Sequence, residues 1–177
     1  MSRVGKNSIR IPDGVSVALN GNVLSIKKGG IEEVYNVPEC LKVERTDDGI
    51  VLAPLNSAQV TRALWGTSQR NVSNIVVGLS EGFKTELEMV GVGYKAAVSG
   101  SKLTMQLGFS HDIVYDIPGG ISIACPKPTT IVVSGHCKKQ VGDVVAVLRG
   151  YRPPEPYKGK GVMKVGEFVY RKEGKKK

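Results

Sequence analysis

An internal repeat of about 80 residues is the feature that most constrains how this chain folds. The segment "VYNVP", Val34 to Pro38, recurs as "VYDIP", Val114 to Pro118, at an offset of 80 residues. Three further pairs are identical at an offset of 79 residues: Gly21 and Gly100, Leu24 and Leu103, and Gly29 and Gly108. Because each copy of a repeat folds as one structural unit, the sequence predicts two tandem domains, which we divide near Gly82 into residues 1–82 and 83–177.

Each copy contains strand patterns. Apolar residues alternate with polar ones at matching places in the two copies: Leu24 and Ile26, then Leu103, Met105 and Leu107. This alternation has the period of a half-buried strand. An Asn-Gly pair at residues 20–21 and a Ser-Gly pair at residues 99–100 precede these strands. Such pairs tolerate positive φ and favour hairpin turns, so we expect antiparallel strands.

A helix is predicted to close each copy. The first runs from near Ser57, a candidate N-cap, to Val77, and the second runs from near Lys138 to Arg149. The apolar residues at helical spacing are Val60, Leu64, Val72, Ile75 and Val76 in the first helix and Val141, Val144, Val145 and Leu148 in the second. We therefore predict an α+β fold of two tandem duplicated domains, each a small antiparallel sheet with one helix packed on one face.

The composition argues against several classes of protein. No apolar run approaches the roughly 20 residues of a membrane helix, and the first residues, "MSRVGKNSIR", lack the apolar segment of a secretory signal. We therefore expect a cytoplasmic protein with no membrane partner. Cys40, Cys125 and Cys137 form no CxxC pair, and with two histidines they show no metal-ligand spacing. The sequence predicts no metal and no cofactor.

Two motifs invite a catalytic interpretation. The segment "GVGYKA", Gly91 to Ala96, resembles the start of a dinucleotide-binding fingerprint, but strand residues follow it where that fingerprint requires a helix. A tight bend entering a strand is the better interpretation. His136 and Cys137 pair a base with a nucleophile, but consecutive residues point in different directions and no nearby acid orients the imidazole. We expect no enzyme, although a helix N-terminus leaves the reactivity of Cys137 open.

The net charge of +9 lies entirely at the two ends of the chain. Residues 1–10 carry +3 and residues 151–177 carry +6, whereas residues 11–150 hold thirteen cations and thirteen acids. A neutral body with basic ends is typical of a scaffold whose ends meet a polyanion. The tail "KEGKKK" contributes the candidate RNA contacts Lys172, Lys175 and Lys176, but a purely solubilising role for it is equally open.

The segment "YRPPEPYKGKGVMK" combines stiff, bare and cationic residues. Its prolines favour an extended path, along which Lys158 and Lys160 project to the same side. Its glycines let a sugar-phosphate backbone approach, and Tyr157 is suited to stack on a base or to hydrogen-bond a ribose. Arg149 and Arg152 extend the patch with forked phosphate contacts. The segment therefore predicts binding to a phosphate backbone of fixed shape.

This segment, the valine-rich helix before it and the upstream "GVGYKA" closely resemble the bacterial large-subunit ribosomal protein family L-six. The resemblance spans nearly the whole chain, from "SRVGKNSI" to "RKEGKKK". It implies a structural protein that binds large-subunit ribosomal RNA near the sarcin-ricin loop and the stalk base. It also implies neighbouring ribosomal proteins as partners, in a region where translational GTPases dock.

The resemblance carries the RNA contacts of the family onto this chain residue by residue. The matching segment is Arg152, Pro153, Pro154, Glu155, Pro156, Tyr157, Lys158, Gly159, Lys160 and Gly161, and a second contact is Gly93, Tyr94 and Lys95. The family commonly continues with an arginine and an aromatic residue, where this chain has Met163 and Lys164. The contact there is expected to have moved by one residue. Two further positions differ from the family pattern: Cys137 stands where the family usually has an acidic cap on the second helix, and Trp65 stands where it usually has a histidine in the first helix. We expect neither difference to change the function.

One other interpretation stays open. The chain is alternatively a non-ribosomal interaction module whose proline-rich segment binds a groove on another protein, with a tail that only solubilises it. A protein partner that survives nuclease treatment in a pull-down distinguishes this interpretation from RNA binding.

Overall fold

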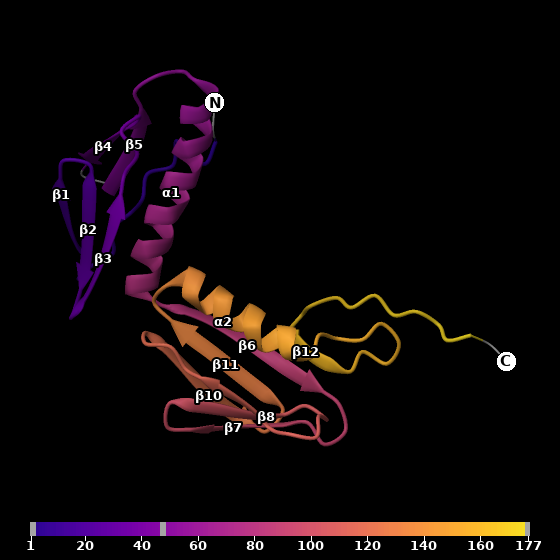
Figure 1. The fold of residues 1–177 in the computed structure, drawn as a ribbon. Helices are drawn as coiled ribbons and strands as arrows, with labels where there is room; N and C mark the ends of the chain where they lie inside the picture. Colours follow the sequence, from indigo (N-terminus) through magenta and orange to yellow (C-terminus); the bar gives the residue numbers. More distant parts are fainter. Residues whose placement is uncertain (1–2, 47–48, 176–177) are drawn as a thin grey trace. The chain divides into compact units, whose positions relative to one another are not determined.

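The computed structural model describes residues 3–46 and 49–175, and the chain divides into two compact units, residues 1–82 and 83–177 (Figure 1). Each unit has its own hydrophobic core. Helices and antiparallel sheets occur in both units, which confirms the predicted α+β fold class.

The first unit combines two small antiparallel sheets with the helix α1, Gln59–Ser80. One sheet has the order β1 (Ser16–Asn20), β2 (Val23–Lys28), β3 (Ile31–Asn36), and the other pairs β4 (Leu41–Thr46) with β5 (Gly49–Pro54). The segment around Ile9 adds to β5, because Ile9 and Ile50 exchange backbone hydrogen bonds of 2.9 and 3.0 Å. Helix α1 contacts β2, β3 and β5 and closes the core.

The second unit repeats this plan and adds strands to it. A three-stranded sheet has the order β7 (Lys95–Ser99), β8 (Lys102–Gln106), β9 (Ile113–Asp116). A four-stranded sheet has the order β10 (Ile121–Lys127), β11 (Thr130–Gly135), β6 (Phe83–Val90), β12 (Gly161–Lys164). Helix α2, Lys138–Tyr151, contacts β6, β11 and β12, and Figure 1 shows it lying along this sheet.

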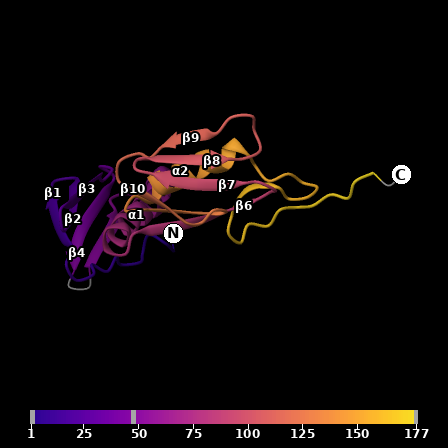
Figure 2. The same cartoon turned by 90° about the horizontal axis from the view of Figure 1, so that it is seen from below.

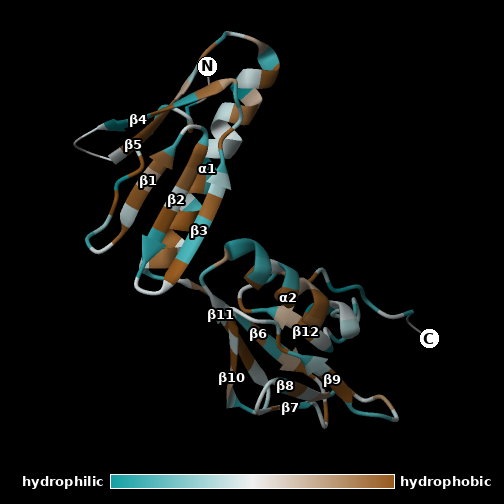
Figure 3. Cartoon of the chain, turned by 60° about the vertical axis from the view of Figure 1, so that its left-hand side comes forward, coloured by the Kyte–Doolittle hydropathy of each residue, from teal (hydrophilic) through white to brown (hydrophobic). Residues whose placement is uncertain are grey.

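Equivalent turns and hydrogen bonds show that the two units are structural duplicates. The strands β1 to β3 and β7 to β9 follow the same order, and both first hairpins turn at a glycine, with φ of 60° at Gly21 and 59° at Gly100. After the third strand, Val37 donates to the Asn22 carbonyl at 2.8 Å, and Ile117 donates to the Ser101 carbonyl at 2.8 Å. Hydrophobic and hydrophilic stretches interleave along the strands (Figure 3), as period-two patterning requires.

The repeated proline explains a feature beyond the prediction, the division of the strands of each unit between two sheets. Pro38 and Pro118 follow β3 and β9, and a proline lacks the N–H that would continue a ladder. The carbonyl of each proline instead accepts a turn hydrogen bond, from Leu41 at 2.9 Å and from Ile121 at 3.3 Å. The repeated "VYxxP" pattern therefore marks the place where the chain passes from one sheet to the next.

The predicted apolar stripe of α1 is wrong at its first two positions. Val60 is 70% exposed and Leu64 is 37% exposed. The buried residues of the helix are Thr61, Trp65, Ser68, Gln69, Val72, Val76, Gly78 and Leu79. Most polar groups of this buried face have partners: the Trp65 indole donates to the Leu52 carbonyl at 2.6 Å, the Gln69 amide donates to the Asn7 carbonyl at 3.3 Å, and the Ser68 hydroxyl accepts from the Tyr35 hydroxyl at 3.1 Å. The Gln69 side-chain oxygen is buried without a hydrogen-bond partner.

The start of α1 also differs from the prediction. The helix begins at Gln59 with Ala58 in the N-cap position, so Ser57 is not the cap. The Asn56 side-chain carbonyl accepts hydrogen bonds from the Ala58 N–H and the Thr61 hydroxyl, so Asn56 and not Ser57 supplies the side-chain contacts at the start of the helix. The helix continues to Ser80, past the predicted end at Val77.

The predicted stripe of α2 is confirmed. Val141, Val144, Val145 and Leu148 are all buried, and the helix runs to Tyr151 rather than ending at Arg149. The stripe packs on the four-stranded sheet, so the end of α2 is held firmly beside β12. The loop between these two elements begins from that fixed point.

Candidate nucleic-acid interface

The predicted RNA-contact segment forms a closed loop, residues 152–160, between α2 and β12. Val162 donates to the Arg152 carbonyl at 2.8 Å and joins the two ends of the loop. The backbone N–H of Glu155 donates to the Lys160 carbonyl at 2.8 Å and closes the tip of the loop. Two cross-loop hydrogen bonds in so short a segment restrict the backbone before any ligand binds. We call residues 152–160 the basic loop.

The extended path predicted for this segment is wrong at its tip. Residues 156–158 form a turn, so strand alternation does not set the directions of Lys158 and Lys160. The reason is the Glu155–Lys160 hydrogen bond, which folds the chain back where three prolines alone would have kept it straight. Both lysines and Tyr157 are nonetheless exposed.

Gly161 anchors the base of the basic loop. Its φ of 145° is one that residues with side chains rarely adopt. A Cβ atom there would lie 2.6 Å from the Pro153 oxygen and 2.6 Å from the Pro154 Cα. The first residue of β12 must therefore be glycine for the loop to close, and the backbone of Gly161 is buried rather than open to a ligand.

The C-terminal tail, residues 165–175, returns to the basic loop. Lys172 donates its backbone N–H to the Pro156 carbonyl at 2.7 Å. Gly159 leaves room for Arg171, because a Cβ atom at Gly159 would lie 3.3 Å from the Arg171 Nη2. Figures 1 and 2 both show the tail and the basic loop at the same end of the second unit. Cations from two separate segments thus gather in one place.

Arg149 is committed to an ion pair with Glu167. Its Nη2 lies 2.6 Å from Glu167 Oε1 and its Nε lies 3.2 Å from Oε2, a forked arrangement. Glu167 also accepts the Lys164 backbone N–H at 3.1 Å. The sequence predicted that Arg149 contacts phosphate. In the structure, two of its guanidinium donors instead bind Glu167 and hold the turn that directs the tail toward the basic loop.

This ion pair predicts a pH dependence of stability. The Arg149 hydrogen bond, with that from the Lys164 backbone, lowers the pKa of Glu167. Ionised Glu167 therefore stabilises the fold above its ordinary pKa range, and this contribution is lost as pH falls through the lowered pKa. At pH 7 we expect Glu167→Gln to unfold at a lower temperature than the unchanged chain, with a difference that shrinks below about pH 4.

Thermal unfolding at a series of pH values measures this difference. Glu173→Gln, at an exposed position of the same tail, is the control and should match the unchanged chain throughout. A Glu167→Gln variant with the same unfolding temperature as the unchanged chain at every pH would contradict the role given to the pair.

Arg152 occupies the start of the basic loop and rests on an aromatic ring. Its guanidinium carbon lies 4.9 Å from the centroid of Phe109, within the range of a cation–π interaction. Phe109 belongs to the connection between β8 and β9, so this contact joins the basic loop to the three-stranded sheet. Phe109 has only a weak local signal in the sequence, an aromatic residue between Gly108 and Ser110 with no charge beside it, so its role is visible only in the folded chain.

Comparison with known proteins bears directly on this loop. The sequence model of the family described as Ribosomal protein L6 matches residues 90–165. The chain is 50% identical to the large ribosomal subunit protein uL6 of Methylocella silvestris and to that of Parvibaculum lavamentivorans. It is 47% identical to the uL6 of Brucella anthropi, and each of the three alignments covers 100% of both chains. This chain belongs to the ribosomal protein L6 family. The resemblance inferred from the motifs is confirmed.

The second contact segment inferred from the L6 resemblance lies before β7. Gly93, with a φ of 79°, and Lys95 are exposed, but Tyr94 is only 7% exposed and packs in the core. Its ring covers Gly91, where a Cβ atom would lie 2.7 Å from the ring carbons. The buried Tyr94 therefore shapes the bend and offers little ring surface to a base. The segment enters a strand, as predicted, and not a helix.

The other cations that the sequence marks as candidate RNA contacts lie at the end of β12 and in the tail. Lys164 ends β12 and is exposed, and Lys172 and Lys175 are exposed in the tail, whereas Lys176 lies outside the described residues. Arg171 and two exposed aromatic residues of the tail, Phe168 at 88% and Tyr170 at 70%, were not among the predicted contacts. The available signal was the pair of aromatic residues, Phe168 and Tyr170, followed directly by the cations Arg171 and Lys172.

Alternative chemistries find little support in the part of the L6 chain that the structure describes. Within residues 3–46 and 49–175 no three His, Cys, Asp or Glu side chains gather as a metal site would require. Over the same residues no helix combines the length and the apolar character needed to cross a membrane. Cys40, Cys125 and Cys137 are free and half-buried, and burial raises the pKa of the Cys125 thiol.

Proposed function

We propose that the basic loop and the tail bind large-subunit ribosomal RNA by clamping its sugar-phosphate backbone. As a member of the L6 family, the chain is a structural, non-enzymatic constituent of the large ribosomal subunit and works in the cytoplasmic ribosome. Its partners are accordingly ribosomal RNA and other ribosomal proteins. The finer proposal concerns which residues meet the RNA and where.

One observation carries this proposal, the gathering of cations from two segments around a loop that hydrogen bonds have already closed. The cations are Arg152, Lys158, Lys160, Arg171 and Lys172. Since the backbone is fixed beforehand, little conformational entropy is lost on binding. Exposed lysines supply point charges and the arginines supply forked donors for phosphate oxygens. Such an arrangement recognises the shape of an RNA backbone more than its sequence.

The site on the ribosome is the second part of the proposal. We place the basic loop near the sarcin-ricin loop and the stalk base, where translational GTPases dock, on the strength of the motif resemblance. In this arrangement Gly93 and Lys95 make a second contact, while neighbouring ribosomal proteins at the stalk base border the chain. The exposure of Gly93, of Lys95 at the start of β7 and of the basic tail supports two contacts with RNA.

The test is a double substitution in the basic loop. Lys158→Ala with Lys160→Ala should weaken binding to purified large-subunit ribosomal RNA. The variant makes fewer phosphate contacts, so fewer counterions are released from the RNA when it binds. We expect the slope of log affinity against log salt to fall in magnitude by about 0.7–0.9 per lysine. Filter binding or fluorescence anisotropy between about 50 and 200 mM salt measures this slope.

A matched control removes the same charge elsewhere. Lys42 and Lys84 are exposed lysines that pair with Glu44 at 3.1 Å and Glu86 at 2.8 Å. A Lys42→Ala, Lys84→Ala variant should keep nearly the unchanged slope. If both double variants lose the same affinity for RNA, binding depends only on the total charge of the chain and not on the basic loop. An unchanged salt slope in the loop variant would refute the proposal. Chemical footprinting of the bound RNA then tests the location at the sarcin-ricin loop.

A further inference from the structure

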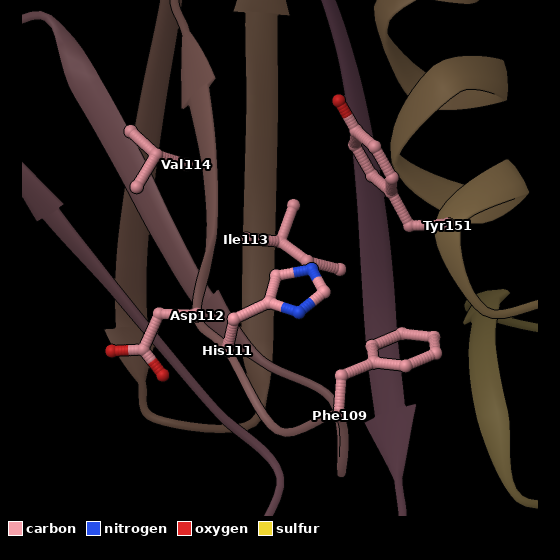
Figure 4. Close-up of a pocket in the computed structure, with 6 residues that line it drawn as sticks. All are labelled: Phe109, His111, Asp112, Ile113, Val114 and Tyr151. Carbon is pink, nitrogen blue, oxygen red and sulfur yellow. The ribbon is translucent and has the colours of Figure 1, made fainter.

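An open pocket of about 370 Å³ lies in the second unit, beside the start of the basic loop. It is formed by the β8–β9 connection with the first residues of β9, and by the last residue of α2. Its lining residues are Phe109, His111, Asp112, Ile113, Val114 and Tyr151. Figure 4 shows the rings of Phe109, His111 and Tyr151 around a common space.

The aromatic side chains of the pocket are partly open to solvent. Phe109 is 41% exposed and Tyr151 is 36% exposed. The rings of Phe109 and His111 are stacked, with centroids 6.0 Å apart and planes 22° from parallel. Exposed aromatic rings grouped around a hollow mark a surface that is covered in the working state, since apolar area left in water costs free energy.

Charge identifies what covers this surface. The Arg152 guanidinium lies over Phe109, and Arg152 is also the first residue of the basic loop. Tyr151 lines the pocket and is the neighbour of Arg152 in the chain, so their Cα atoms are about 3.8 Å apart. A ligand that enters the pocket therefore meets a cation at its edge. An aromatic group joined to a phosphate would fill the pocket and pair its negative charge with Arg152. An apolar protein side chain would fill the pocket but leave Arg152 without an anion.

We propose that the pocket receives one unstacked nucleobase of the RNA whose backbone the basic loop binds. The inference rests on the proposed RNA binding and deepens it from backbone clamping to capture of a base. The aromatic rings supply stacking faces, as in proteins that hold single-stranded RNA segments. Ile113 and Val114 supply apolar contact, and the Tyr151 hydroxyl can hydrogen-bond the base edge.

Two single substitutions test the base pocket. His111→Ala removes one ring at an exposed position, and Phe109→Leu removes an aromatic face while keeping apolar contact for Arg152. Each should weaken binding to purified large-subunit ribosomal RNA by roughly 5- to 150-fold, which corresponds to about 1–3 kcal/mol of base–aromatic stacking. His111 carries no phosphate contact, and leucine at position 109 keeps apolar contact with Arg152, so the salt slope of both variants should stay close to that of the unchanged chain.

Ultraviolet crosslinking gives an independent readout. In the unchanged chain, irradiation of the complex should attach a nucleotide to the peptide that contains Phe109 and His111, and mass spectrometry identifies the adduct. Circular dichroism of both variants confirms that they fold. The Lys158→Ala, Lys160→Ala variant is measured beside them, since it changes the salt slope and they do not.

The outcomes separate the two proposals. Unchanged affinity of both pocket variants, with a weakened lysine variant, would overturn the base pocket and leave backbone binding in place. Nucleotide adducts that fall elsewhere in the chain, with none on this peptide, would likewise overturn it. Unchanged binding in all three variants would remove the proposed RNA binding itself, and the base pocket with it.

Discussion

Replacement of Trp65 by alanine is expected to reduce the free energy of unfolding of the first unit by about 3–5 kcal/mol, the range for a large aromatic side chain removed from a core. Trp65 is 7% exposed, and its indole donates to the Leu52 carbonyl at 2.6 Å. Gly5 lies so close to the ring that a Cβ atom there would be 2.5 Å from its carbons. The substitution therefore removes the contact that joins the N-terminal segment, α1 and β5.

Urea denaturation followed by circular dichroism measures this loss, and hydrogen exchange locates it. Amides of β5 and α1 should lose protection while those of β6 and α2 keep theirs, because the second unit has a separate core. Trp65→Phe is the matched control, since it keeps most of the apolar volume and removes the hydrogen bond, and it should cost about 1 kcal/mol or slightly more. A Trp65→Ala variant within about 1 kcal/mol of the unchanged chain would contradict the role of this side chain.

Substitution of Gly161 by alanine is expected to open the basic loop and to reduce RNA affinity more than loss of either lysine. The new Cβ atom would lie 2.6 Å from backbone atoms of Pro153 and Pro154, which have no flexible end that could move aside. The φ of 145° adds backbone strain, of about 1–3 kcal/mol. The Val162–Arg152 and Glu155–Lys160 hydrogen bonds depend on this close approach and should weaken together.

Binding to purified large-subunit ribosomal RNA and protease cleavage after the loop lysines both report on this change. Cleavage at Lys158 and Lys160 should become faster in Gly161→Ala, because an opened loop fits the active site of a protease more readily than a closed one. Gly100→Ala is the control: it has a φ of 59° and no atom within 4 Å of the added Cβ, so it carries the strain without the clash. If Gly161→Ala and Gly100→Ala behave alike, the close approach at the loop base is unimportant for binding.

The sequence predicted the plan of the fold because the repeat and the strand periods are local patterns. Turn glycines at 21 and 100, the α2 stripe and the strand after Gly93 are all where the sequence placed them. The α1 stripe failed at Val60 and Leu64 for a non-local reason. Hydrogen bonds from Trp65 to β5 and from Gln69 to the N-terminal segment rotate the buried face, and no window along the helix contains those partners.

For the binding site, the sequence determined the chemistry of each residue, and the tertiary structure decided which residues work together. The pattern of prolines, glycines and lysines is enough to indicate an element that meets a phosphate backbone. Only the folded chain pairs Arg149 with Glu167, buries Tyr94, and turns the predicted extended segment into a closed loop beside Arg171. The physical reason is that contacts between residues far apart in the chain depend on core packing. The charge of lysine, the restricted backbone of proline and the missing side chain of glycine are properties of each residue by itself.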